Sequence, residues 1–144
     1  MKHSVILRLS LVLVLFSLCG KLSAQKGELS VIPIPTEYEL GEGEFVIDQY
    51  TVLYANPTQV EVTDIAEGFQ RQLRTVTGML LPVMPLAEFE DQQNAVVFHL
   101  MPDAELGAEG YQLEVTPDHI LIHANKPAGL FYAVQTLYQL LPPE

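Results

Sequence analysis

The sequence predicts a single α+β domain with a mostly antiparallel sheet and two helices packed on one face. Short apolar segments with two-residue alternation are typical of strands, and two longer segments carry apolar residues at the three- and four-residue spacing of helices. The strand segments 111–115 and 120–124 are joined by a short turn, which favours antiparallel pairing. Residues 25–144 are enough for one hydrophobic core but not for two.

Residues 1–24 have the organisation of a secretory signal peptide. The opening "MKHSVILR" is basic and is followed by the apolar run "LSLVLVLFSL". This run is shorter than the roughly 20 residues of a spanning helix. The segment ends with the small residues Ser23 and Ala24. We expect cleavage after Ala24 and a periplasmic or extracellular location. An uncleaved membrane anchor is one alternative. A lipoprotein signal at Cys19 is another, although Leu18 stands where such signals have a small residue.

Charge and cysteine content limit the partners of the remaining chain. The formal net charge of −11 becomes −14 without the first 24 residues, because they hold three basic residues and no acid. Such a chain repels phosphate backbones and anionic lipid surfaces, so we expect neither nucleic acid nor membrane as a partner after signal cleavage. Cys19 is the sole cysteine, so residues 25–144 contain no disulfide and no cysteine metal site.

The first part of the predicted domain, residues 31–56, reads as short strands. Prolines in "VIPIP" suit an edge or entry strand. The segments "EYEL" and "EFVI" predict a hairpin through "GEG", whose glycines tolerate positive φ. "TVLYAN" (51–56) predicts another short strand.

An amphipathic helix is predicted over residues 59–77. Thr58 and Glu61 have the spacing of a capping box, and Gly78 is a suitable C-terminal stop. The apolar stripe recurs at helical spacing and consists of Ile65, Ala66, Phe69, Leu73 and Val76.

The following segments predict a second group of strands. "LLPVM" (80–84) reads as an edge strand because of Pro82, and "EFEDQQN" (88–94) as an acidic loop. "AVVFHLM" (95–101) is apolar on both faces, as in a central strand. "YQLEV" and "ILIHA" form a hairpin through "TPDH". The predicted core comprises Val96, Phe98, Leu113, Val115, Ile120, Ile122, Phe69 and Leu73.

A last helix is predicted after Asn125, which suits an N-cap, and Pro127, which suits the first turn. Pro142-Pro143 stop this helix. Its predicted sheet-facing stripe consists of Leu130, Val134, Leu137 and Leu141, widened on one side by Phe131 and Tyr138. Tyr132 and Leu140 fall outside the stripe. They are either scattered surface apolar residues or part of an interface with a further domain.

No residue pattern in the chain predicts catalysis. His119 and His123 lie four apart on a predicted strand, roughly 13 Å from each other, which is too far to share a metal. His99 reads as a satisfied core histidine. The acids around Glu88 and Glu90 lack the spacing of a calcium loop, and neither a phosphate loop nor a G-x-S-x-G nucleophile motif is present. The residues predict no catalytic, cofactor-binding or metal residue, and no cofactor.

The segment "GYQLEVTPDHILIHANKPAGLFYAVQTLYQLLP" (110–142) resembles the end of the N-terminal domain of β-N-acetylhexosaminidases, glycoside hydrolase family 20. The opening "VIPIPTEYELGEGEFVI" is similar to the start of the same domain, so the resemblance covers about residues 31–142. Ala133 departs mildly from the family pattern, which often has glycine there.

The resemblance implies a non-catalytic accessory domain over residues 25–144, followed in the family by a (β/α)8 barrel that hydrolyses terminal N-acetylhexosamine residues. Catalysis there is substrate-assisted and uses an adjacent Asp-Glu pair. This chain contains no Asp-Glu; Glu90-Asp91 has the reverse order. No catalytic residue can therefore be assigned, the barrel is absent from the sequence, and we expect it to be a partner within the same polypeptide, contacted through Tyr132 and Leu140.

Two other interpretations stay open at the level of sequence. One is the similar domain that precedes other glycosidase barrels, of the α-glucuronidase or O-GlcNAc hydrolase type. The other is a free-standing exported module for binding or interaction.

Overall fold

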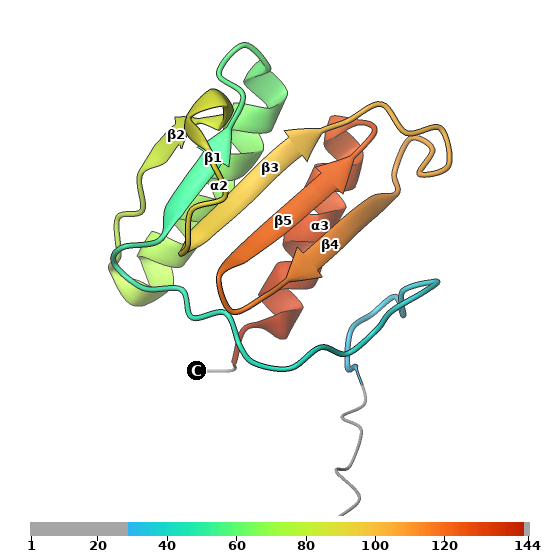
Figure 1. Ribbon diagram of the computed structural model, residues 1–144, viewed down its shortest axis with the longest axis horizontal. Coiled ribbons are helices and arrows are strands. Elements are labelled where there is room, and N and C mark those ends of the chain that lie inside the picture. The colour runs from blue at the N-terminus through green and yellow to red at the C-terminus, as the bar shows by residue number, and fades with distance from the viewer. Residues whose placement is uncertain (1–28, 143–144) are drawn as a thin grey trace, which may run out of the picture.

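The computed structural model describes residues 29–142, so the predicted signal peptide lies outside the described residues. Five strands form one sheet in the order β2-β1-β3-β5-β4, and two helices cover one of its faces (Figure 1). In chain order the elements are β1 (Val52–Ala55), α2 (Val60–Thr77), β2 (Val83–Pro85), the short 3₁₀ helix η1 (Leu86–Glu88), β3 (Ala95–Leu100), β4 (Tyr111–Val115), β5 (His119–Ala124) and α3 (Pro127–Leu140).

The α+β class and the two helices on one face are confirmed, but the sheet is mixed rather than mostly antiparallel. Strand β1 runs parallel to β2 and β3, and β3 runs parallel to β5; only β4 and β5 pair antiparallel. The parallel pairing of β1 with β2 follows from the connection through α2, since a helix between two strands returns the chain to the same end of the sheet. The hairpin of β4 and β5 is as predicted.

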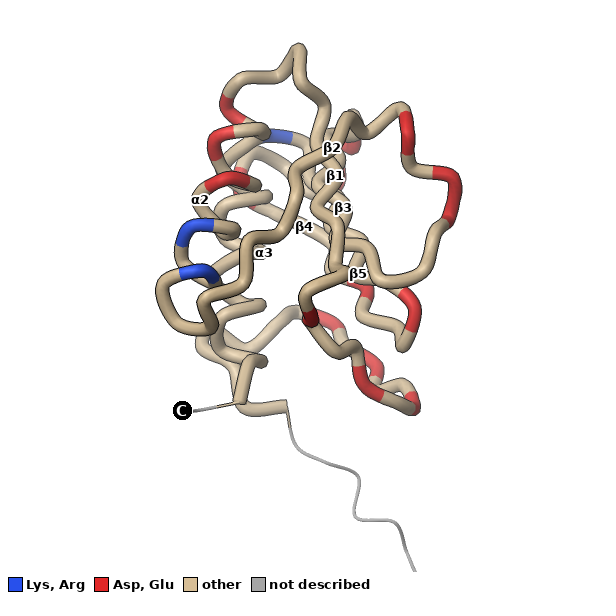
Figure 2. Tube along the Cα trace, turned by 90° about the vertical axis from the view of Figure 1, so that its left-hand side faces the viewer, with Lys and Arg blue, Asp and Glu red and all other residues tan. Residues whose placement is uncertain are grey.

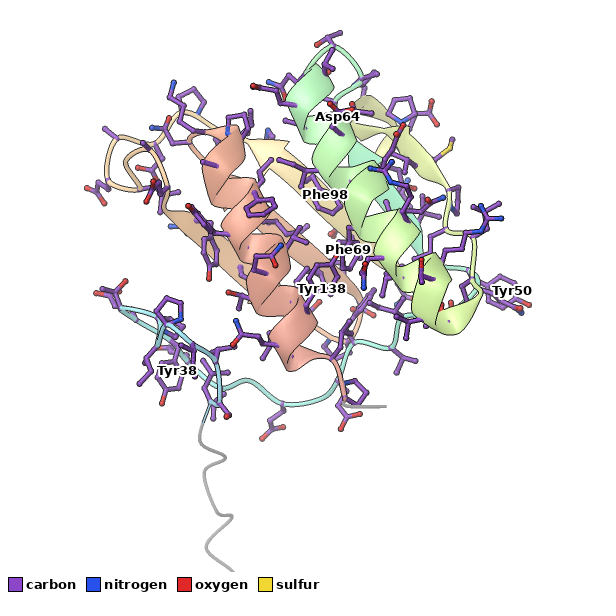
Figure 3. All side chains as sticks on the ribbon, turned by 180° about the vertical axis from the view of Figure 1, so that it is seen from behind. Tyr38, Tyr50, Asp64, Phe69, Phe98 and Tyr138 are labelled. Atoms are coloured by element: carbon purple, nitrogen blue, oxygen red, sulfur yellow. The ribbon has the colours of Figure 1, made fainter. Side chains whose placement is uncertain are left out.

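The core lies between the sheet and the two helices. Phe69 of α2 contacts the ring of Phe98 on β3, with centroids 6.1 Å apart, and that of Tyr138 on α3, at 5.6 Å. Figure 3 shows these three side chains between the helices and the sheet. Six of the eight predicted core residues are buried here: Val96, Phe98, Ile120, Ile122, Phe69 and Leu73.

Two predicted core residues are more exposed than expected. Leu113 is partly buried, and Val115 is 46% exposed. Both belong to β4, which has only β5 as a neighbour. The last residue of an edge strand lacks cover from a strand on its outer side, so alternation alone overestimates its burial.

Helix α2 begins at Val60, one residue later than the capping box predicts. Gln59 precedes it without a side-chain cap, whereas the Thr58 hydroxyl donates to Asn56 Oδ1 at 2.9 Å. A local turn around Asn56 therefore takes the hydroxyl that we expected to cap the helix. The stop at Gly78 is confirmed: its φ is 76°, and its N–H donates to the carbonyl of Arg74. Val76, predicted within the stripe, is 51% exposed.

The predicted hairpin of "EYEL" and "EFVI" is wrong, because residues 37–47 contain no strand. Tyr38 and Leu40 are exposed, so this segment has no continuous apolar face to pair on the sheet. It nevertheless packs on the domain: Phe45 and Ile47 contact the core, and Gly43, with φ 91°, lies against Pro117 in the β4–β5 turn.

Helix α3 is confirmed in extent and in its main stripe. Pro127 is its first residue and Lys126 its N-cap, while the predicted starter Asn125 instead donates to the Gly107 carbonyl. Its buried residues include Leu130, Val134 and Leu137. Phe131 does not widen the packed stripe as predicted, since it is 50% exposed.

Close approach at the start of α3 explains one glycine. A Cβ on Gly129 would overlap the carbonyl oxygen of Gly110 and approach the Ala124 Cβ to 2.9 Å. The missing side chain lets the first turn of α3 rest directly on the backbone that leads into β4.

Candidate interaction surfaces

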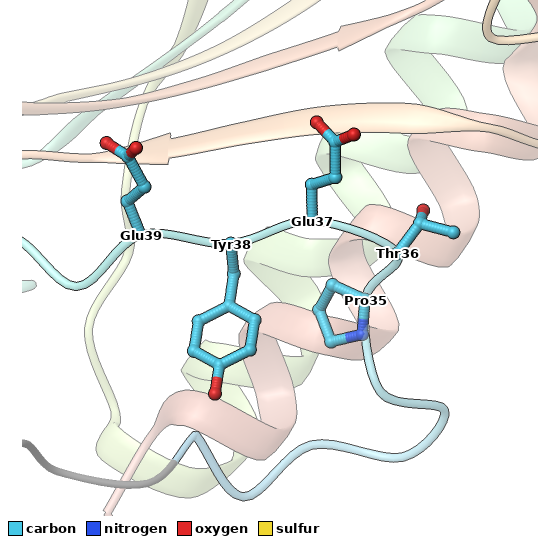
Figure 4. A pocket seen from close by; sticks show the side chains of 5 residues that line it. All are labelled: Pro35, Thr36, Glu37, Tyr38 and Glu39. Atoms are coloured by element: carbon cyan, nitrogen blue, oxygen red, sulfur yellow. The ribbon is translucent and has the colours of Figure 1, made fainter.

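Within residues 29–142, no three side chains of His, Cys, Asp or Glu gather in a way that could hold a metal ion. A shallow hollow is lined by the consecutive residues Pro35, Thr36, Glu37, Tyr38 and Glu39, and Figure 4 shows the two glutamates on one side of the chain and the tyrosine on the other. Its lining comes from one segment only. Active sites instead bring polar groups together from several elements.

The outer side of α3 carries exposed apolar side chains. Tyr132 is 43% exposed and Leu140 is 42% exposed, in agreement with their predicted place outside the buried stripe. Phe131 joins them, with its ring centroid 5.8 Å from that of Tyr132. The sequence interpretation missed Phe131 because its position beside the stripe suits either a packed or an open side chain.

The end of α3 is tied to the start of the described chain. The Gln139 side chain accepts from the Ile32 N–H at 2.8 Å and donates to the Ile32 carbonyl at 3.0 Å. This paired contact holds Ile32, a strongly exposed apolar residue, at the end of the helix that carries Leu140. The apolar surface of α3 is thus extended by a segment remote in sequence.

A polar network fixes the entrance to the sheet. Thr51 is fully buried, and its hydroxyl donates to Asn94 Oδ1 at 2.6 Å. The Asp48 carboxylate accepts from the Asn94 amide and from the Tyr50 N–H, both at 2.8 Å. These bonds, the Asn94 one above all, hold the pKa of Asp48 below its usual value. Because the Asn94 N–H also donates to the Asp118 carbonyl, the network joins the approaches to β1, β3 and β5.

The sheet face away from the helices carries three histidines. His99 on β3 lies opposite His123 on β5, with ring centroids 5.3 Å apart. His99 is half-buried on this face and is not the core histidine that we predicted. The reason is strand alternation: Val96 and Phe98 point toward the helices, so His99 points away.

His123 and His119 have different neighbours on this face. Burial, and then the neighbouring His99, lower the pKa of His123, whereas Glu114 on β4 acts in the opposite direction. His119 lies apart from this pair, with Nδ1 3.6 Å from the Asp91 carboxylate and its ring edge-on to Phe89. The structure therefore pairs His123 with His99, and not with His119.

Charge is distributed unevenly over the described residues. Arg71 and Arg74 lie on α2 and Lys126 precedes α3, whereas acidic positions follow the loops on the other side of the sheet as well as α2 (Figure 2). None of the helices in this part of the chain is long and apolar enough to cross a membrane.

The fold is that of a small α+β domain with exposed apolar side chains on the outer side of α3. The sequence model described as glycosyl hydrolase family 20, domain 2, matches residues 28–144. This chain therefore belongs to glycosyl hydrolase family 20, of which it contains domain 2.

Relatives of known type agree with this assignment. A β-hexosaminidase of Porphyromonas gingivalis is 28% identical over 116 residues, which are 81% of this chain and 14% of that protein. The solved N-acetyl-β-hexosaminidase of Streptomyces plicatus is 34% identical, with a TM-score of 0.67. The match covers 78% of this chain and 21% of the Streptomyces plicatus chain. The family 20 β-N-acetylhexosaminidase of Streptomyces coelicolor is 32% identical, with a TM-score of 0.65 over the same shares. The chain thus spans only a small part of these proteins.

Proposed function

We propose that this chain is the accessory domain of an exported β-N-acetylhexosaminidase, in which a catalytic (β/α)8 barrel of the same polypeptide removes terminal N-acetylhexosamine residues. The observation that carries the proposal is the match of residues 28–144 to domain 2 of family 20. The similar proteins are hexosaminidases of which this domain is 14–21%. The accessory domain contributes no catalytic residue; its role is structural support of the barrel.

The outer side of α3 is the surface that we assign to the barrel. Tyr132 and Leu140 are exposed on a helix whose other side is packed on the sheet. Large apolar side chains that gather on an otherwise polar surface are typical of interfaces between domains. The contact between Gln139 and Ile32 adds further apolar area beside Leu140.

Export rests on the sequence of residues 1–24, with its basic opening, its short apolar run and its small-residue end. We propose a periplasmic or extracellular location after cleavage. Mass spectrometry of the protein isolated from its native cells tests this directly, with Gln25 expected as the first residue. An intact N-terminus would contradict cleavage, and a lipid on Cys19 would establish the lipoprotein alternative.

The activity test compares this chain alone with the longer polypeptide that contains it. The chain alone should not hydrolyse a chromogenic N-acetyl-β-glucosaminide, whereas the longer polypeptide should. Turnover by the chain alone, abolished by a substitution within it, would contradict a purely supporting role. If the longer polypeptide cleaves a glucuronide and not the N-acetylhexosaminide, the parent activity is of another type.

A further inference from the structure

The sheet face away from the helices places two imidazoles at one level of adjacent parallel strands. His99 and His123 are direct register partners in β3 and β5. Neighbouring strands lie about 4.8 Å apart, so side chains that leave the same face at one level stay within reach of each other. Their ring centroids are 5.3 Å apart. Two imidazoles bound to one tetrahedral zinc ion have ring centres roughly 5 Å apart, because each Zn–N bond is about 2.0–2.1 Å long.

One nitrogen of this pair lacks a partner. His123 Nδ1 is buried from solvent and makes no hydrogen bond. Buried polar nitrogens are normally satisfied, and one that is not requires a reason. An ion held between the two rings supplies such a reason, because ligation engages a lone pair that no protein donor reaches. His119 Nδ1 is also without a hydrogen bond, but it has the Asp91 carboxylate 3.6 Å away.

From these observations we propose that His99 and His123 together bind one divalent ion of the zinc, nickel and copper class. Imidazole nitrogens suit these ions, whereas calcium and magnesium prefer oxygen ligands. The described residues offer no third His, Cys, Asp or Glu at ligand distance, so the two imidazoles are the ligands that this part of the chain supplies. Glu114, whose carboxylate acts electrostatically on His123, partly offsets the charge of the ion.

The proposal goes beyond the accessory role and does not depend on it. The two histidines lie on the sheet face opposite α3, away from the surface that we assign to the barrel. A site with two protein ligands also differs from a closed structural zinc site, which has four. We therefore expect a reversible site that is not needed for folding.

The test is a Zn²⁺ titration of the purified chain, prepared without a histidine tag and followed by calorimetry and by NMR of the imidazole signals. Excess Mg²⁺ in all samples occupies the acidic loops, which would otherwise attract cations. We expect saturable binding of one ion, with shifts of the His99 and His123 signals and little change at His119. His99→Gln and His123→Gln should each weaken binding at least tenfold. His119→Gln is the matched control on the same strand and should bind as the unchanged chain does.

Circular dichroism of each variant establishes that the fold persists, and the NMR result on the unchanged chain stands even if a variant unfolds. Absence of saturable Zn²⁺ binding in the unchanged chain would overturn the proposal. So would undiminished binding by the variant that carries both His99→Gln and His123→Gln. If His119→Gln loses binding while His99→Gln and His123→Gln keep it, the ion binds elsewhere, and the proposed site at His99 and His123 is equally refuted.

Discussion

Phe69 lies where α2, α3 and the sheet meet. It is 1% exposed and contacts the rings of Phe98 and Tyr138. Replacement by alanine removes these contacts and leaves a cavity, so Phe69→Ala should lower the free energy of unfolding by about 3–5 kcal/mol. Burial at this same cluster also raises the pKa of the Tyr138 phenol.

Chemical denaturation measures the effect of Phe69→Ala, and Val76→Ala is the matched control on the same helix. Val76 is 51% exposed, so its replacement should change the free energy of unfolding by no more than about 0.5 kcal/mol. A loss below about 1 kcal/mol for Phe69→Ala would contradict the packing described here.

Asp48 makes stability depend on acidity. Its bonds from Asn94 and Tyr50 hold its pKa below the usual value of 3.8 in the folded state. The carboxylate therefore contributes stability above pH 3.8, and this contribution is lost as the pH falls through the lower folded pKa. Asp48→Asn keeps the shape of the side chain but removes the charge.

We expect Asp48→Asn to be less stable than the unchanged protein at pH 5, with a gap that narrows toward pH 2.5. Urea unfolding of both proteins across this range measures the gap, and the shared carboxylates cancel in the comparison. A gap that stays constant with pH would show that the charge of Asp48 is not what stabilises the network around Thr51.

At the scale of elements, the absence of a side chain at Gly129 allows the first turn of α3 to pack closely on the backbone before β4. Gly129→Ala should destabilise the protein, because the new methyl group would overlap the Gly110 carbonyl oxygen and crowd Ala124. Alanine is otherwise favoured in helices by about 0.5–1 kcal/mol. Gly68→Ala in α2 is the matched control, since its Cβ has only Arg71 at 3.7 Å. Thermal unfolding should show a lower Tm for the first and an equal or higher Tm for the second; equal gains in both would refute the close approach.

Most elements of this fold could be predicted from local patterns. Strand 111–115, strand 120–124 and both helices follow from periodicity, prolines and a glycine stop. The parallel pairing of β1 with β2 was also within reach, since residues 51–84 contain strand, helix and strand in succession. The supposed hairpin in 37–47 failed because alternation predicts a strand only where a partner and a buried face exist.

The candidate surfaces were less predictable, for a physical reason. Tyr132 and Leu140 could be placed from the helical repeat alone. His99 and His123 are separated by a loop, the whole of β4 and a turn, and only the register of two nonconsecutive strands brings them together. Nothing in either local sequence specifies that register.

At the scale of the whole molecule, the proposed barrel interface makes Tyr132 and Leu140 important for association rather than for folding. Both are more than two-fifths exposed, so Tyr132→Ser with Leu140→Ser should change the free energy of unfolding of this chain by less than about 1 kcal/mol. The same change should weaken the binding of the chain to a separately produced barrel at least tenfold, or by about 1.4 kcal/mol. Val115→Ser is the matched control, because Val115 is 46% exposed but lies on the edge strand β4. Calorimetric titration of the barrel measures binding, and denaturation measures stability. If the double variant unfolds, the two residues belong to the core of this domain; if it binds the barrel as the control does, the interface lies elsewhere.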